Sequence, residues 1–189
     1  MGYDRVQGPN TYGSGCMEGA QRMFKWFREK FEAGSLGCYN PASLKGMSLH
    51  AEGRAMDIAL NANDDDERAR GDAIVTLVSE HPEWFGAQEM LWRGRIWSWN
   101  KRSLGVRYPL PDGEQKAAHM NHVHLGIDVY AAEHWTPDWV EDMEEEMNWS
   151  ELEIHVAAAV NKALDMKEVQ DKVRLLVIDA INKEEKEGD

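Results

Sequence analysis

Two short motifs contain most of the side chains in this chain that could bind a metal ion. The first holds His50 and Asp57, seven positions apart, and the second holds His119, His122 and His124. Three of the seven histidines therefore fall within six residues of one another, which chance rarely produces. Imidazole nitrogens and carboxylate oxygens are ligands that zinc accepts, so the two motifs together predict a zinc site.

The second motif is expected to lie at the start of a strand. Residues 122–127 alternate well enough for a strand, and side chains two positions apart in a strand point to the same face. His122 and His124 would therefore face one side of the sheet, and His119 could approach from the preceding turn. We expect the three imidazoles to converge.

The first motif needs a tight return of the chain. Gly53 lies between His50 and Asp57, and glycine readily adopts the backbone conformations that such a return requires. Both side chains could then reach one point. With one histidine of the second motif they would give zinc three ligands and leave a fourth position open, as in catalytic zinc sites.

The elements that would carry these motifs indicate a compact α+β unit. Apolar residues at helical spacing predict helices, and short apolar runs bounded by turn residues predict strands. In chain order the expected elements are a helix over 18–31, a strand over 35–39, a loop over 40–47, a strand over 55–60, a helix over 65–79, strand edges over 90–92 and 95–99, a loop containing Gly105, Pro109, Pro111 and Gly113, and a strand over 122–127.

The net charge of −13 is unevenly distributed. Residues 1–134 carry 18 acidic and 15 basic side chains, whereas residues 135–189 carry 16 acidic and 6 basic ones. We therefore expect the domain with the metal site over 1–134 and an acidic helical segment over 135–189. Neither part would attract nucleic acid by charge. The helical segment would pack on the domain, act as a linker, hold a further domain, or pair with a second copy through heptad-like apolar steps.

Two further features bear on where the protein works. No apolar run approaches the roughly 20 residues that cross a bilayer, and the first residues lack the order of a signal peptide, so no membrane association is expected. Cys16 and Cys38 could form one disulfide. They lack a Cys-x-x-Cys spacing, and two buried free thiols are the expected state.

The two motifs resemble those of a known family. The first reads Ser-x-His-x-x-Gly-x-Ala-x-Asp at Ser48, His50, Gly53, Ala55 and Asp57, and the second contains a His-x-His strand. Both resemble the zinc peptidases of the D-alanyl-D-alanine carboxypeptidase and phage L-alanyl-D-glutamate endopeptidase group, whose fold is shared with the Hedgehog signalling domain. The resemblance covers roughly residues 15–130 and implies a small antiparallel sheet flanked by helices.

The same resemblance implies roles for the site residues. His50, Asp57 and His124 would be the zinc ligands, and His122 would orient or stabilise the polarised substrate carbonyl. The substrate would be the stem peptide or a cross-link of peptidoglycan. Because the Arg-Ile-Trp-Ser segment at 95–98 resembles endolysin peptidases of phages that infect actinobacteria, we expect accumulation in the host cytoplasm before action at the cell wall.

The sequence departs from the family pattern at two places. Many members carry Asp or Glu as general base three residues before the last ligand, where this chain has Asn121, which cannot accept a proton. His119 is the expected base, since penicillin-insensitive murein endopeptidases look similar with the order His-x-x-His-x-His. The family's carboxylate-binding Arg or Gln is also missing upstream, and Arg54, Arg93 or Arg95 would have to replace it.

A second class of function stays open. The chain could be a non-catalytic, zinc-stabilised binding or structural module, such as a virion or signalling component, and Asn121 is the feature that favours it. A protein without zinc would require all motif residues to coincide by chance. Metal analysis would distinguish a protein without zinc from the two zinc-binding alternatives. A hydrolysis assay would distinguish the zinc peptidase from the non-catalytic zinc module.

Overall fold

A computed structural model describes residues 4–9, 11–43, 48–99, 106–109 and 119–140, with only the backbone described at 106–109. The chain divides into two units, Met1–Glu146 and Met147–Asp189, and every described residue belongs to the first. Apart from 135–140, the acidic segment expected over 135–189 lies outside the described residues.

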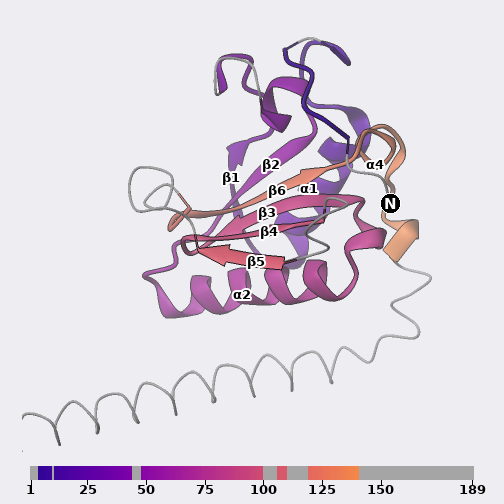
Figure 1. Cartoon of the computed structure of the whole chain (residues 1–189). Helices are drawn as coiled ribbons and strands as arrows, with labels where there is room; N and C mark the ends of the chain where they lie inside the picture. Colours follow the sequence, from indigo (N-terminus) through magenta and orange to yellow (C-terminus); the bar gives the residue numbers. More distant parts are fainter. Residues whose placement is uncertain (1–3, 10, 44–47, 100–105, 110–118, 141–189) are drawn as a thin grey trace, which may run out of the picture. The chain divides into compact units, whose positions relative to one another are not determined.

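A six-stranded sheet forms the centre of the described unit (Figure 1). Its strands are β1 (Gly34–Gly37), β2 (Ala55–Ala59), β3 (Ala87–Trp92), β4 (Arg95–Ser98), β5 (Val106–Pro109) and β6 (His122–Ile127). Their spatial order is β1-β2-β6-β3-β4-β5, so the last strand in the chain lies between β2 and β3. All neighbouring strands are antiparallel, which confirms the expected α+β class and antiparallel sheet.

The two faces of the sheet differ in chemistry, and β6 shows the division. Val123, Leu125 and Ile127 are completely buried and point to one face. His122 and His124 alternate with them and point to the other face, where they are nearly buried. One strand therefore supplies both core packing and the histidines of the second motif.

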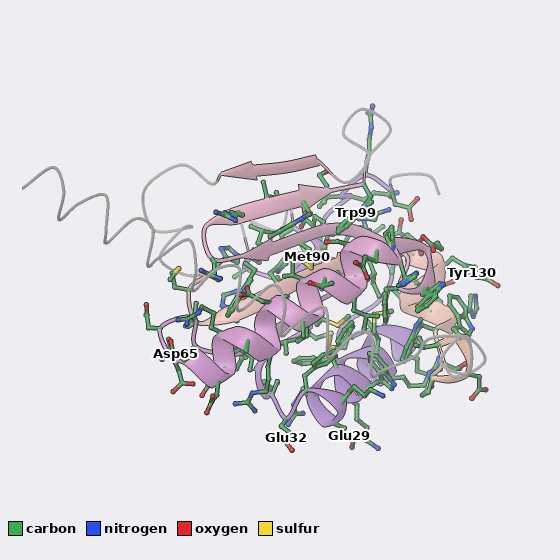
Figure 2. The ribbon with its side chains drawn as sticks, turned by 90° about the horizontal axis from the view of Figure 1, so that it is seen from below. Glu29, Glu32, Asp65, Met90, Trp99 and Tyr130 are labelled. Atoms are coloured by element: carbon green, nitrogen blue, oxygen red, sulfur yellow. A yellow bond between two sulfur atoms is a disulfide. The ribbon has the colours of Figure 1, made fainter. Side chains whose placement is uncertain are left out.

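Helices cover the apolar face of the sheet. The helices are α1 (Glu18–Lys30) and α2 (Asp65–Glu80), and α2 lies in front of the strands in Figure 2, which views the unit from below. α1 contacts β2, and α2 contacts β3 and β6. The packing is close, because a Cβ on Gly71 of α2 would lie 2.4 Å from the indole of Trp92.

A third helix, α4 (Val129–His134), follows β6 and packs against α1. Trp135 comes directly after it, is completely buried, and places its ring 6.0 Å from that of Trp26 in α1. Val140 is also completely buried. The folded unit therefore extends beyond residue 134, where the change in charge placed the expected boundary.

Most expected elements are confirmed within a few residues, including both long helices and the strands of both motifs. The loop expected between residue 99 and the second motif is wrong in part, because residues 106–109 form β5 and pair with β4. β5 is an edge strand. Pro109 at its end has no N–H to donate, and this is tolerated because β5 pairs on one side only in the described sheet. Among the described residues, no helix combines the length and apolar character needed to cross a membrane.

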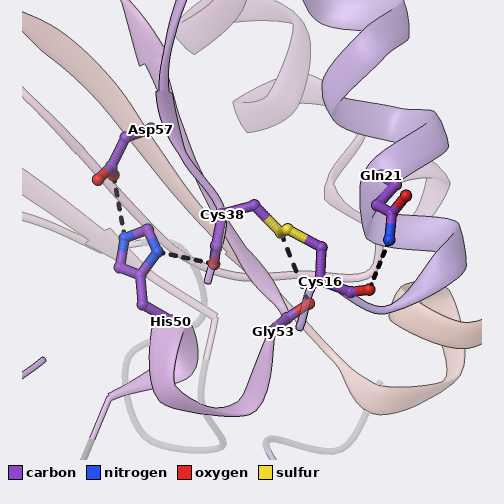
Figure 3. Close-up of a disulfide and its surroundings, with 6 residues drawn as sticks. All are labelled: Cys16, Gln21, Cys38, His50, Gly53 and Asp57. Atoms are coloured by element: carbon purple, nitrogen blue, oxygen red, sulfur yellow. Dashed lines mark hydrogen bonds and ion pairs between the residues drawn. A yellow bond between two sulfur atoms is a disulfide. The ribbon is translucent and has the colours of Figure 1, made fainter. Parts of the chain in front are cut away.

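Cys16 and Cys38 form a disulfide, so the expectation of two free thiols is wrong (Figure 3). The bond ties the segment before α1 to the residue after β1. Gln21 supports this segment by donating a hydrogen bond to the Cys16 carbonyl at 2.7 Å. A disulfide depends on the spatial proximity of two Cβ atoms, which a separation of 22 residues along the chain does not reveal.

Replacing both cysteines, Cys16→Ser with Cys38→Ser, is expected to lower the free energy of unfolding by about 3 kcal/mol, because the closed loop restricts the unfolded chain. Urea denaturation without reductant would measure this difference. Reductant should bring the wild-type protein to the stability of the variant and leave the variant unchanged. Equal stabilities of the two proteins under oxidising conditions would contradict the bond.

Candidate metal centre

His50 is carried by a short 3-10 helix, η2 (Leu49–Glu52), whose N-terminus is capped by the side chain of Ser48. Gly53 ends this helix with a φ of 72°, a left-handed conformation that glycine adopts without the steric cost of a Cβ. The chain then enters β2, which carries Asp57. The tight return expected between the two residues of the first motif is therefore confirmed.

Gly53 also permits a close approach of two chain segments. A Cβ at this position would lie 1.9 Å from the carbonyl oxygen of Gly15. The backbone N–H of Met17 donates to the Gly53 carbonyl at 2.8 Å, and Cys38 Sγ lies 3.8 Å from the same oxygen (Figure 3). The disulfide-bonded segment thus packs directly on the turn that carries the first motif.

Three side chains from the two motifs converge on one point. Asp57 and His124 lie directly opposite each other on β2 and β6, and η2 brings His50 against them. His50 Nε2 lies 3.1 Å from both Asp57 Oδ1 and His124 Nδ1. His124 Nδ1 lies 3.0 Å from Asp57 Oδ1. The structure therefore assembles the expected ligands into a group that could hold a metal ion.

The outer nitrogen of each imidazole faces a hydrogen-bond acceptor. His50 Nδ1 lies 3.0 Å from the Cys38 carbonyl oxygen, and His124 Nε2 lies 3.2 Å from Glu89 Oε1. Because carbonyl and carboxylate oxygens only accept, each outer nitrogen must carry the hydrogen. In the neutral rings, His50 Nε2 and His124 Nδ1 then direct lone pairs toward Asp57. Hydrogen bonds of this kind to the outer nitrogen hold a histidine ring in the orientation in which it binds a metal.

The separations of the three atoms suit a tetrahedral ion. Zinc binds histidine nitrogen and carboxylate oxygen at about 2.0–2.2 Å, which places the ligand atoms of a regular tetrahedron about 3.3–3.6 Å apart. The separations here are 3.0–3.1 Å. His50, Asp57 and His124 therefore offer donor atoms of the kind that zinc accepts, at separations a few tenths of an ångström shorter than those of a regular tetrahedron.

Without a cation, a proton occupies the same point. Burial opposes the charge of Asp57, but its close contacts with the His124 and His50 rings hold the pKa of its carboxyl well below the ordinary value. Burial also opposes the charge of His124, yet hydrogen bonds to Asp57 and Glu89 raise its pKa to about 9. His124 is then an imidazolium at pH 7, and metal binding must release its Nδ1 proton.

His122 lies beside this group. Its Nε2 is 3.5 Å from Asp57 Oδ1, and its Nδ1 is 2.8 Å from Asn121 Oδ1. The amide oxygen accepts, so Nδ1 carries the hydrogen and Nε2 is a bare nitrogen that faces the site. Burial, helped by nearby His119 and opposed by Asp57, lowers the pKa of His122 to about 4, and the ring is neutral at pH 7.

His119 completes a cluster of imidazoles. Its ring centre lies 4.8 Å from that of His122 and 6.0 Å from that of His124. The turn between β3 and β4 holds the segment, since the Arg93 N–H donates to the His119 carbonyl at 2.9 Å. The structure therefore brings together all three histidines of the second motif.

Two of the arginines considered for binding a substrate carboxylate are engaged elsewhere. Arg54 is completely buried and pairs with buried Glu52 at 2.6 Å, so it cannot reach a substrate. Arg93 pairs with Asp72 at 2.9 Å. Arg95 is exposed on β4. The buried Arg54 pair is therefore structural.

The remaining histidines lie outside the group. His81 stacks on Trp84 with ring centres 3.7 Å apart, and His134 lies 4.8 Å from the Tyr130 ring. His155 falls outside the described residues. The first two therefore contribute to local aromatic contacts, in agreement with the expectation that they are structural or exposed.

Glu89 contacts the site but belongs to neither motif, and it was not predicted from the sequence. It is an acidic residue within β3, where most neighbouring side chains are buried. A carboxylate in such a strand is costly unless it is paired, and this could have marked it as unusual. Its partner, His124, is known only from the alignment of β3 with β6.

Comparisons with known proteins gave one family. The family model described as VldE, C-terminal domain, matches residues 12–120, which is more than half of the chain. The matched region includes His50, Asp57 and His119 and ends before His122. Comparisons with curated proteins and with solved structures found no match.

The close approach at Gly53 predicts that Gly53→Ala is strongly destabilising. The positive φ alone costs a residue with a side chain about 1–2 kcal/mol, and displacing the Gly15 carbonyl should add about 1–3 kcal/mol. The matched control is Gly37→Ala, where φ is also positive but nothing lies within 4 Å of the added Cβ. Similar losses of unfolding free energy for the two variants, measured in urea, would contradict this packing.

The pKa of His124 predicts how metal binding depends on pH. Its ordinary value is 6.5 and its folded value is about 9 without metal, so the bound proton competes with a divalent cation at pH 7. Apparent affinity for Zn²⁺ should rise about tenfold per pH unit up to about pH 9 and then level off. Titration against a competing chelator would measure it. A constant affinity between pH 7 and 9 would argue against this proton.

The stability of the metal-free protein should change with pH in the opposite direction to the Zn²⁺ affinity. A folded pKa above the unfolded one stabilises the protein fully below about pH 6.5, and this contribution disappears as the pH rises through about 9. Urea denaturation of the chelator-treated protein at several pH values would measure the loss.

Proposed function

We propose that this chain, which belongs to the VldE C-terminal domain family, is a zinc-dependent hydrolase of amide bonds. The observation that carries the proposal is the convergence of His50 Nε2, Asp57 Oδ1 and His124 Nδ1 within 3.1 Å of one another. Catalytic zinc sites use three protein ligands and keep a position for water or substrate, whereas structural sites usually use four. Two imidazoles and one carboxylate fit the first class.

Bound zinc would supply a Lewis acid that polarises a carbonyl and makes water more acidic. The protein's own contribution to proton transfer would come from His122 and His119. His122 Nε2 is the bare nitrogen that faces Asp57, so it can accept a hydrogen bond from water at that atom, but a pKa of about 4 makes it a weak base at pH 7. His119 lies beside it and would act as the base that takes the proton and returns it to the leaving amine.

Asn121 has a definite place in this scheme. Its side-chain oxygen accepts the Nδ1 hydrogen of His122 and thereby keeps the other nitrogen of that ring available. Many of the zinc peptidases that the two motifs resemble carry a carboxylate base at this position. We propose that here the base function has moved to the imidazoles, while Asn121 sets the tautomer of one of them.

We further propose that the substrate is the stem peptide or cross-link of bacterial peptidoglycan. The support is the likeness of both motifs to those of zinc peptidases that act on such peptides. The residues of these motifs are the ones that the fold brings together in the candidate site. In this proposal the protein acts at the bacterial cell wall.

A second candidate is a zinc-stabilised module without turnover. Asn121 favours it, because an amide cannot act as general base and its oxygen is already occupied by His122. Such a module would bind metal through the same three ligands and gain stability from it. It would leave every amide bond of the wall intact.

We expect the zinc-loaded protein to release new amine ends from purified peptidoglycan, and a chelator to abolish the release. His124→Ala should lose metal and hydrolysis together. His122→Ala should keep metal and lose hydrolysis by about a hundredfold or more, as expected for a group that orients the water and the base during proton transfer. Mass spectrometry of the released ends and metal analysis of each protein would measure these effects.

His134→Ala is the matched control, because this histidine is exposed and lies outside the metal group. It should leave hydrolysis and metal content unchanged. Folded, zinc-loaded wild-type protein that cleaves no wall type would favour the second candidate. Full hydrolysis and full metal content in His124→Ala would overturn the metal site itself.

A further inference from the structure

We propose that Glu89 is a positioning residue for the metal ligand His124, and that its charge completes the electrostatic balance of the site. This inference rests on the proposed metal site, but it concerns a residue that neither motif contains. Glu89 lies on β3, and its Oε1 is 3.2 Å from His124 Nε2. It acts through the imidazole, on the side of the ring opposite the ligand atom.

The strand register places Glu89 for this contact. Glu89 lies directly opposite Gly126 on β6, and Leu91 lies directly opposite His124. Residues 124 and 126 share a face, as do 89 and 91. The carboxylate therefore reaches His124 diagonally across the strands, a distance that long side chains span.

Gly126 leaves the space that this carboxylate uses. A Cβ at position 126 would lie 2.9 Å from Glu89 Cγ and 2.3 Å from Leu49 Cδ1. Leu49 belongs to η2, the helix that carries His50. The missing side chain at one position of β6 thus lets a carboxylate reach one ligand and lets η2 approach the sheet with the other.

The two histidine ligands have outer partners of different charge. His50 donates to a neutral backbone carbonyl, that of Cys38, whereas His124 donates to a carboxylate. A charged acceptor makes a stronger hydrogen bond and increases the electron density at the opposite ring nitrogen. His124 is therefore the ligand whose orientation and donor strength are set by a side chain.

The charge of Glu89 also matters for a divalent cation in this nearly buried site. Two neutral imidazoles and Asp57 would leave a dication with a net charge of +1, and Glu89 brings the total to zero. The buried guanidinium of Arg54 is already paired with Glu52 at 2.6 Å and also donates to Gln88 at 3.0 Å. Burying a neutral set costs less than burying a net charge.

The test compares Glu89→Gln and Glu89→Ala with the matched control Glu83→Gln, using Co²⁺ as the probe. Glu83 is an exposed glutamate just before the same strand. Competition with a chelator gives the affinity, and the visible absorption of bound Co²⁺ reports the ligand field. Neither readout uses hydrolysis.

We expect Glu89→Gln to weaken Co²⁺ binding about tenfold and Glu89→Ala up to about a hundredfold. This is the usual range for residues that hydrogen-bond to a metal ligand. The absorption spectrum should shift in both, and Glu83→Gln should match wild type. Glu89→Gln keeps the shape of the side chain, so the test remains valid even if Glu89→Ala does not fold. Circular dichroism would confirm folding.

Two further outcomes distinguish a failure of the proposed role of Glu89 from a failure of the proposed metal site. If both Glu89 variants bind Co²⁺ as wild type does, with unchanged spectra, while His124→Ala binds none, the role of Glu89 is wrong and the metal site stands. If His124→Ala binds Co²⁺ as tightly as wild type does, the metal site is wrong and the role of Glu89 falls with it.

Discussion

Convergence of three ligand atoms requires each imidazole to turn one particular nitrogen toward Asp57, and a neutral imidazole by itself does not select one. The selection comes from the outer hydrogen bonds of His50 and His124, which end on the Cys38 carbonyl and on Glu89. The fold supplies both of these acceptors. The disulfide ties down the residue that supplies the carbonyl, and the alignment of β3 with β6 supplies the carboxylate.

Close backbone packing makes these contacts precise. The approach of Gly53 to Gly15 brings the disulfide-bonded segment onto the turn that carries His50, and no residue with a Cβ would fit there. Gly126 on β6 has a similar effect, because its missing side chain leaves room for both η2 and Glu89. Both glycines therefore shape the site, although neither has a side chain that could bind the metal. The apolar face of the sheet, held by α1 and α2, provides the rigid base.

Electrostatics explains why the group is stable in either state. An imidazolium at His124 can satisfy Asp57 and Glu89 in the absence of metal, and a divalent cation replaces its proton when metal binds. His122 remains neutral because it is buried among other histidines. The buried pair of Arg54 and Glu52 lies apart from this exchange and fixes the connection between η2 and β2. The carboxylates of Asp57 and Glu89 would thus be fully compensated by a bound dication, and by one positive charge against two negative ones without it.

The sequence by itself determined the residues of both motifs, the return at Gly53, the alternation along β6 and the two long helices, because each follows from local rules of backbone conformation and periodicity. It could not determine the partner of Glu89, the bond between Cys16 and Cys38, or the burial of Arg54. Nor did it show that residues 106–109 pair as β5, since turn residues around them resemble a loop. These features depend on which distant segments meet and in what register, and only the tertiary structure decided that.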